Sequence, residues 1–442
     1  MSLQRKYFTS VEDLKLFLKD HTPALYVSSG TSTVIPFEAL EKVMGDGVVA
    51  DLSGIKGSLS FRNDGELTVK GHVTWKEAKE FCLQHGYEIM TSPTEELAGV
   101  LAGIATSCTG ERSFGFGNLR SQVIDLVYLD YNGEEKTLSV HSKIKNDLAT
   151  KLSFYQKDFA QFKNFKNAPY PRFEVETDLM TGTEGQLGII VEATLKVRKH
   201  ASETYLFFKL PKWTEDYTAH LEIYEKIQNF RSRVFACEFL DYQSLSYIPE
   251  NENPAPGMDL IFLEIAQSDF EDFYTDFVST LKHVSEDNIF EMSGSKCRAL
   301  RVLVPRSIFE VNSRMGVTKK GTDVQVSREH FKDLLNTYRE LNQLGVACNL
   351  FGHFGDAHLH FNYMPTKDQE EQCLKKFDEL YARVLTWNGS PFAEHGIGLL
   401  KKKFIEPFHN EVQRQVFSEI KNKMDPYQQF FPQGFMNTKG RI

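Results

Sequence analysis

Residues 181–190 read TGTEGQLGII, a run of glycines and small polar residues that ends in β-branched side chains. Glycine allows tight backbone turns, whereas isoleucine and valine favour extended strands. The stretch therefore predicts a tight loop that leads directly into a β-strand. Apolar and polar residues alternate from Ile189 onward, which extends the predicted strand.

Two earlier segments share this richness in small residues. Residues 28–32 read SSGTS at the end of a predicted strand, where backbone amides and hydroxyls can converge on a phosphate. Residues 99–117 read GVLAGIATSCTGERSFGFG, which permits the close approach of a flat ligand. An ordinary turn without a ligand is the simpler interpretation of the first segment taken alone.

In order and spacing, these three segments resemble the PCMH-type FAD-binding domain of the vanillyl-alcohol oxidase superfamily. The resemblance implies that FAD is bound along roughly residues 1–200. The sequence differs from the family at Val27, Ser28 and Ser29, where relatives carry a basic residue and more glycines. It also differs at Leu101-Ala102, where relatives carry Gly-Gly. The first two segments contain no histidine, and Cys108 matches no known linkage site, so FAD is expected to be noncovalent. The expected cofactor-binding residues are Ser28, Ser29, Gly30, Thr31, Ser32, Thr106, Ser107, Gly110, Phe116, Gly117, Glu184, Gly185, Gly188 and Ile189.

A second motif lies in the C-terminal half, where residues 352–360 read GHFGDAHLH. His358 and His360 are two residues apart and share one face of a strand, and the Gly355-Asp356 turn can fold His353 back toward them. Farther on, Glu394-His395-Gly396 offers a carboxylate and another imidazole. Such ligands suit Zn²⁺, Mn²⁺ or Fe²⁺. A histidine-rich hairpin that is hydrogen-bonded within a core is the alternative.

These segments resemble the GHxGDGNxH and EHGxG motifs of the FAD-dependent D-lactate and D-2-hydroxyglutarate dehydrogenases and the glycolate oxidase D subunit. The resemblance implies that His353, His360 and Glu394 bind a divalent metal and that His395 is the catalytic base. Ala357 and His358 stand where relatives carry Gly and Asn. His358 is therefore open to three interpretations: an extra ligand, a second base or a specificity residue.

A substrate carboxylate requires a cation, and two residues are candidates. Arg306 lies upstream of Gly321-Thr322-Asp323 at a spacing that resembles that of the family's substrate-binding arginine. Its guanidinium group fits a carboxylate bidentately. Lys320 is the weaker candidate, because relatives place their lysine one position later. Arg301 and Arg314 are alternatives.

Several helices and turns are also predicted. Ser10 is expected to cap a helix over 11–20. Thr74 is expected to cap a helix that ends at Gly86, and Ser327 is expected to cap a helix that ends at Gly345. Asn132-Gly133 marks a hairpin turn. Strands are expected near 203–210, 234–240 and 258–265, and strand, turn and strand over 346–365.

Length and composition limit the class of protein. The chain has 442 residues, of which 41% are hydrophobic and 25% charged, with a formal net charge of -9. This acidic balance argues against nucleic-acid binding. The six scattered cysteines indicate reduced thiols, and no apolar stretch is long enough to span a bilayer. We expect a cytoplasmic protein, or alternatively one peripheral to the inner face of the membrane.

The expected fold class is α+β, with an FAD-binding domain of two α/β subdomains over 1–200. A substrate-binding cap domain with an antiparallel sheet is expected over 201–385, and 386–442 is expected to return to the FAD domain. The expected reaction oxidises a D-2-hydroxy acid such as lactate, glycolate or 2-hydroxyglutarate to the 2-oxo acid, with hydride transfer to flavin N5.

The electron acceptor is left open among a quinone, an electron-transfer flavoprotein and O₂, and a homodimer is one oligomeric option. The alternatives are an aldonolactone or sugar-alcohol oxidase, an enzyme resembling alkylglycerone-phosphate synthase, and a non-catalytic flavin-binding electron-transfer subunit.

Overall fold

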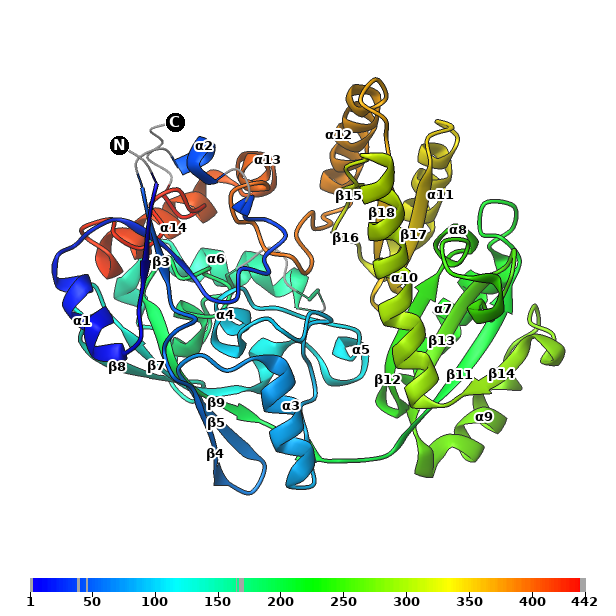
Figure 1. The fold of residues 1–442 in the computed structure, drawn as a ribbon, viewed down its shortest axis with the longest axis horizontal. Helices are drawn as coiled ribbons and strands as arrows, with labels where there is room; N and C mark the ends of the chain where they lie inside the picture. Colours follow the sequence, from blue (N-terminus) through cyan, green and yellow to red (C-terminus); the bar gives the residue numbers. More distant parts are fainter. Residues whose placement is uncertain (1–2, 38–39, 45–46, 164, 167–170, 438–442) are drawn as a thin grey trace. The chain divides into compact units, whose positions relative to one another are not determined.

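The computed structural model describes residues 3–37, 40–44, 47–163, 165–166 and 171–437 (Figure 1). The chain forms two compact units. The first comprises Met1–Gly110, Asn118–His200 and Glu394–Ile442, and the second comprises Glu111–Gly117 and Ala201–Ala393.

The first unit contains a small parallel sheet with strand order β1-β3-β2. Its strands are β1 (Gln4–Tyr7), β3 (Val48–Asp51) and β2 (Ala24–Val27). Helix α1 (Val11–Lys19) connects β1 to β2 in sequence and begins after Ser10, whose hydroxyl accepts a hydrogen bond from the Asp13 amide. The predicted cap is therefore confirmed. The helix buries Leu14, Phe17 and Leu18 in the hydrophobic core.

A five-stranded antiparallel sheet forms the second layer of this unit, in the order β4-β5-β9-β7-β8. Its strands are β4 (Ser58–Asn63), β5 (Glu66–Lys70), β9 (Ile189–Lys196), β7 (Val123–Leu129) and β8 (Glu135–Ser139). The central strand β9 begins at Ile189, directly after the glycine loop, so the predicted loop-to-strand junction is confirmed. The turn between β7 and β8 contains Gly133 with φ +75°, and the Gly133 amide donates to the Asp130 carbonyl at 2.9 Å, which confirms the predicted hairpin.

Helices complete the first unit. They are α2 (Leu40–Met44), α3 (Trp75–Gln84), α4 (Val100–Ala105), α6 (Leu152–Phe159), α13 (Ile405–Phe408) and α14 (Glu411–Met424). Thr74 and Glu77 form a reciprocal capping box at the start of α3, as predicted for the Thr74 cap. The C-terminal helix α14 packs on α6 through Phe417 and Tyr155, whose ring centroids lie 5.7 Å apart.

The second unit is built on an eight-stranded sheet of antiparallel pairs, in the order β14-β11-β13-β12-β17-β18-β15, with β16 also paired to β18 (Figure 1). Its strands are β11 (Glu203–Leu210), β12 (Val234–Leu240), β13 (Asp259–Ala266), β14 (Ile289–Met292), β15 (Lys320–Gly321), β16 (Val324–Gln325), β17 (Cys348–His353) and β18 (His358–Tyr363). The strands predicted near 203–210, 234–240 and 258–265 are confirmed.

Helices cover both faces of this sheet. They are α5 (Ser113–Phe116), α7 (Thr218–Ile227), α8 (Tyr242–Leu245), α9 (Phe270–Val278), α10 (Gly294–Met315), α11 (Phe331–Asn342) and α12 (Glu370–Thr386). Helix α10 packs Leu300 and Val304 into a cluster with Phe207 of β11. Phe208, the next residue of β11, points to the opposite face and contacts Phe277 of α9. The central strands are buried because both of their faces are covered.

The α+β class with an antiparallel sheet in the second half is confirmed, and two details of the helices differ from expectation. Ser327 does not cap an α-helix: a 3-10 turn over Arg328–His330 precedes α11, and the Ser327 hydroxyl donates to Glu329 instead. The 22-residue helix α10 was not predicted, because Pro305 lies inside it and removes a backbone donor. Among the described residues, no helix is both long and apolar enough to cross a membrane.

Candidate active site

The β17–β18 hairpin positions three histidines. Its register pairs His353 with His358 across the strands, and His360 follows two residues later on the face that His358 shares. Ala357 closes the turn with a left-handed backbone, φ +52°. Gly352 makes room for His360, because a Cβ at that position would lie 3.1 Å from the His360 ring.

The three imidazole rings lie close together and are buried. Ring centroids are 4.7 Å apart for His358 and His360, 5.2 Å for His353 and His358, and 6.1 Å for His353 and His360. The strand-turn-strand prediction for this segment is confirmed, and the turn does fold His353 back toward the other two. His358 is closer to each of the two histidines predicted as ligands than those two are to each other.

Each ring has one nitrogen held by an oxygen of a neighbouring segment. His353 Nδ1 lies 2.9 Å from Glu238 Oε1, and His358 Nε2 lies 2.9 Å from Asp323 Oδ1. His360 Nδ1 lies 3.1 Å from the Thr322 carbonyl oxygen. These oxygens only accept hydrogen bonds, so each neutral ring carries its proton on the contacting nitrogen and keeps a lone pair on the other. This is the arrangement that orients histidine ligands in metal sites.

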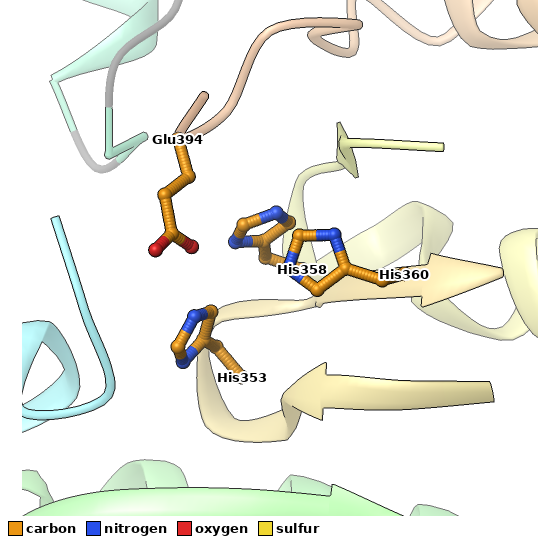
Figure 2. Close-up of side chains that lie close together, drawn as sticks. All are labelled: His353, His358, His360 and Glu394. Atoms are coloured by element: carbon orange, nitrogen blue, oxygen red, sulfur yellow. The ribbon is translucent and has the colours of Figure 1, made fainter. Parts of the chain in front are cut away.

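Glu394 completes the candidate metal site. It directly follows Ala393, the last residue of the second unit, whose amide donates to the Asp323 carbonyl at 3.2 Å. Covalent continuity therefore delivers Glu394 to the edge of the hairpin. One potential ligand atom from each of His353, His358, His360 and Glu394 lies within 4.8 Å of the other three, and Figure 2 shows these side chains converging on one region.

The residue after Glu394 is His395, the predicted base. Its ring offers a nitrogen within the same 4.8 Å limit of ligand atoms from His360 and Asp323. The sequence analysis identified the histidines and Glu394, but it missed Glu238 and Thr322 as their partners. It used Asp323 only as a landmark. No local pattern signals these three residues. Glu238, Asp323 and Thr322 lie 115, 35 and 38 positions from the histidines that they contact, and only the tertiary fold brings them together.

The turn between the two strands is held by a separate network around Asp356. Its carboxylate accepts from the Ser113 hydroxyl at 3.0 Å and pairs with Arg231 at 2.7 Å. Its carbonyl accepts from the Gln325 amide at 2.9 Å. These contacts fix the Gly355-Asp356 turn, and with it the separation of the histidines on either side.

The two residues predicted to bind the substrate carboxylate, Arg306 and Lys320, lie outside the histidine cluster. Arg306 is on α10, where its side chain is 72% exposed and pairs with Glu310 one helical turn away. Lys320 is on β15 and pairs with Glu370 at the start of α12. The structure does not bring either residue into the histidine group.

The first predicted flavin segment lies at the end of β2 in the first unit. Gly30 has φ +68° and open space where a Cβ would be. Ser28 packs against Gly99, since a Cβ at Gly99 would lie 2.4 Å from the Ser28 hydroxyl oxygen. Ser29 Oγ lies 3.1 Å from Nε2 of His72, a residue that the sequence analysis did not single out. Thr31 and Ser32 continue the loop, and Ser32 Oγ accepts from the Val34 amide at 3.4 Å.

The second predicted flavin segment is divided between the units. Thr106 caps the end of α4, with its hydroxyl donating to the Ala102 carbonyl, and Ser107 follows with φ +49°. Gly110 packs tightly against backbone, because a Cβ there would lie 2.0 Å from the Ser92 carbonyl oxygen. Phe116 and Gly117 group with the second unit, where Phe116 packs against Phe235.

The third segment has several structural roles. The Glu184 carboxylate accepts from the amides of Ile397 at 2.6 Å and Gly398 at 3.0 Å, and so holds the chain that follows His395. Gly185 borders open space, with φ +69°. Gly188 packs against Tyr128, and burial raises the pKa of that phenol to about 12. The Ile189 side chain lies in the hydrophobic core, so only its backbone is available to a cofactor.

Comparison with known protein families matches both halves of the chain. Residues 199–433 match the family described as FAD linked oxidases, C-terminal domain. Residues 9–139 match the family described as FAD binding domain. The two matches cover the candidate metal site and two of the three predicted flavin segments.

Individual relatives are hydroxy-acid dehydrogenases. The chain is 25% identical over 437 residues to the mitochondrial D-lactate dehydrogenase [cytochrome] of Kluyveromyces lactis, which covers 93% of this chain and 69% of the relative. It is 26% identical over 343 residues to D-2-hydroxyglutarate dehydrogenase of Xanthomonas citri pv. viticola, covering 73% of this chain and 65% of the relative.

Among solved structures, the chain resembles alkyldihydroxyacetonephosphate synthase, with a TM-score of 0.66. The likeness covers 97% of this chain and 75% of that structure at 15% sequence identity. At this identity the likeness establishes a common fold.

Proposed function

The chain belongs to the family of FAD linked oxidases defined by their C-terminal domain, and from that premise we propose that this flavoprotein oxidises a D-2-hydroxy acid to the 2-oxo acid. Two kinds of relative support this choice of substrate class. The names of the relatives from K. lactis and X. citri specify D-lactate and D-2-hydroxyglutarate.

One observation carries the proposal: potential ligand atoms of three buried imidazoles and the Glu394 carboxylate all lie within 4.8 Å of one another. The charge balance fits a cation there. Glu238 and Asp323 are buried carboxylates bonded to imidazoles, and Glu394 adds a third negative charge. A divalent ion among the neutral imidazoles would place positive charge beside these carboxylates, and such ligands suit it. We propose His353, His360 and Glu394 as ligands of Zn²⁺, Mn²⁺ or Fe²⁺.

The proposed chemistry divides between cofactors and side chains. Bound FAD supplies an acceptor for the two electrons of the substrate C–H bond, and a divalent ion supplies a Lewis acid for its hydroxyl oxygen. His395 takes the hydroxyl proton, a role that suits a neutral imidazole. Loss of one hydride and one proton from the hydroxy acid gives the 2-oxo acid.

Arg306 remains the proposed partner of the substrate carboxylate, and Lys320 the second choice. The Arg306–Glu310 pair is an exposed i,i+4 contact, and such pairs contribute only about 0.3–0.5 kcal/mol. The guanidinium group can therefore exchange Glu310 for a substrate carboxylate at little cost. Replacing Arg306 by Lys tests the role: KM for the hydroxy acid should rise, because the bidentate contact is lost.

Purified protein should be yellow, and an anaerobic substrate panel tests the proposal. D- and L-lactate, glycolate, D- and L-2-hydroxyglutarate and malate are added without oxygen while flavin absorbance is recorded. We expect bleaching by at least one D-2-hydroxy acid, and much slower bleaching by its L-enantiomer. His395→Ala should slow the bleaching by roughly 100-fold or more. His330→Ala, which removes a partly exposed histidine elsewhere in the second unit, is the control.

Several outcomes would reject this substrate class. Bleaching by sugar alcohols or aldonolactones alone would indicate a different oxidase. Turnover of a substrate with no net flavin reduction would favour the alternative of an enzyme resembling alkylglycerone-phosphate synthase. Bound flavin that no substrate reduces would favour an electron-transfer subunit.

The reoxidation partner is proposed only by class: a quinone, an electron-transfer flavoprotein or O₂. Stopped-flow reoxidation of the reduced flavin with each acceptor distinguishes them. We expect the protein in the cytoplasm or at the inner face of a membrane, which cell fractionation tests, and sedimentation tests whether it forms a homodimer.

A further inference from the structure

We propose that His358 is a third imidazole ligand of the metal, so that the site has three histidines and one glutamate. The inference rests on the proposed metal site and deepens it. It assigns a coordination role to a residue for which the sequence pattern leaves three roles open.

Position is the first argument. His358 is nearer to each predicted ligand histidine, at 4.7 and 5.2 Å between ring centroids, than those two are to each other, at 6.1 Å. With a metal–nitrogen bond of about 2.0–2.1 Å, rings on one ion have centroids about 4.5 Å apart at a right angle and about 5.2 Å apart at a tetrahedral angle. The two distances to His358 lie near these values, and the 6.1 Å between His353 and His360 corresponds to a wider angle between those two ligands.

Ring orientation is the second argument. Asp323 accepts from Nε2 of His358, so the lone pair of the neutral ring is on Nδ1. Glu238 and the Thr322 carbonyl hold His353 and His360 in the same way, by one nitrogen each. His358 therefore has the same outer support as the two predicted ligands, and support of this kind orients histidines toward metals.

Charge and burial supply the third argument. His358 and Asp323 are both 0–1% exposed, so the pair has no access to water. A role as a second base would require His358 to exchange protons with substrate or solvent from this enclosed position. A role as a metal ligand requires only the neutral ring and one lone pair, which the pair with Asp323 provides.

The coordination number follows from this ligand set. Four protein ligands complete a tetrahedral site, as in structural zinc sites, and leave no position for a substrate. An ion held by these four residues would need at least one further ligand position for an oxygen of a 2-hydroxy acid. Three imidazoles also favour Zn²⁺, Fe²⁺ or Co²⁺ over Mg²⁺ and Ca²⁺, which prefer oxygen ligands.

X-ray absorption at the zinc edge tests the inference on the wild-type protein. Its metal is first removed and then replaced by one equivalent of Zn²⁺. We expect scattering from three imidazoles. His358→Asn should reduce the count to two and weaken Zn²⁺ binding by about 10-fold or more in competition with a chelator. The matched control is His220→Asn, which removes another buried histidine paired with a buried aspartate, Asp259, at 3.0 Å.

The outcomes separate this inference from the proposed function. Two imidazoles in the wild type, or unchanged Zn²⁺ affinity in a folded His358→Asn variant, overturns the ligand role and leaves the two-histidine site intact. Absence of bound metal overturns both metal assignments. Three imidazoles in a protein whose flavin no hydroxy acid reduces supports the ligand role while rejecting the proposed substrate class.

Discussion

Nε2 of His358 lies 2.9 Å from Oδ1 of Asp323, and this contact joins two side chains that are buried side by side at the edge of the β17–β18 hairpin. It fixes which nitrogen of the ring carries the proton. Because the contact sets the direction of the lone pair, a change at Asp323 should be felt by a metal that Asp323 does not itself bind.

Asp323→Asn is the first prediction. The amide keeps the volume of the carboxylate but loses its charge, so His358 becomes a poorer donor to a cation. We expect Zn²⁺ affinity to fall by roughly 10-fold, measured by chelator competition. Asp259→Asn, which alters the equivalent pair with His220, should leave the affinity unchanged. Equal losses in both variants would point to general destabilisation instead.

The second prediction concerns Lys421, a buried lysine on α14. Its amine donates to the carbonyls of Gln186 and Phe430 and pairs with buried Asp425 at 2.6 Å. Lys421→Met leaves the carboxylate uncompensated, at a cost of about 3–5 kcal/mol. We expect the thermal midpoint to fall by roughly 10 °C. Lys423→Met, on the exposed side of the same helix, should change it little, and a similar small shift for Lys421→Met would refute the prediction.

The third prediction compares two glycines of the predicted flavin segments. Gly110→Ala would place a Cβ 2.0 Å from the Ser92 carbonyl oxygen. The Cβ of Gly185→Ala would lie in open space, and this substitution costs about 1 kcal/mol because alanine disfavours the positive φ of that position. We expect Gly110→Ala to lower both the thermal midpoint and the flavin content per protein, read from visible absorbance. Gly185→Ala should retain most of its flavin. The reverse order would show that backbone packing at Gly110 does not shape the cradle.

The fourth prediction is a pH dependence of stability. Burial lowers the pKa of His409 to about 4, whereas an unfolded histidine titrates near 6.5. As pH falls through this window, the unfolded state binds more protons and the free energy of unfolding decreases. Between pH 7.5 and 5, the titration of His409 lowers the free energy of unfolding by about 2 kcal/mol.

The variant His409→Phe should lack this contribution, since phenylalanine does not titrate and fills the space beside Phe417. Urea unfolding of both proteins at pH 7.5 and 5 measures the difference. Parallel loss of stability in the two proteins would assign the acid sensitivity to other groups.

Local sequence patterns predicted much of this structure. Ser10 and Thr74 cap helices as expected, and the histidine segment forms the predicted strand, turn and strand. These features depend on hydrogen bonds and side-chain alternation within a few residues. The spacing of His358 and His360 likewise follows from strand geometry alone.

The features that were missed depend on contacts distant in sequence. Helix α10 contains Pro305, and the packing of Leu300 and Val304 on β11 outweighs this local penalty. Glu238 reaches His353 across 115 positions, and no short pattern marks such a partner. Thus the identity of the site residues could be predicted, whereas the network that orients them required the tertiary structure.

Anaerobic flavin reduction in metal-depleted and reloaded protein is the most direct single measurement. The protein is chelated without loss of FAD, mixed with the D-2-hydroxy acid found by the substrate panel, and compared with the same sample after one equivalent of Fe²⁺, Co²⁺ or Zn²⁺. We predict that chelation slows bleaching by at least 100-fold and that reloading restores it. Equally fast bleaching with and without the metal would contradict a metal-assisted hydroxy-acid site at His353, His360 and Glu394.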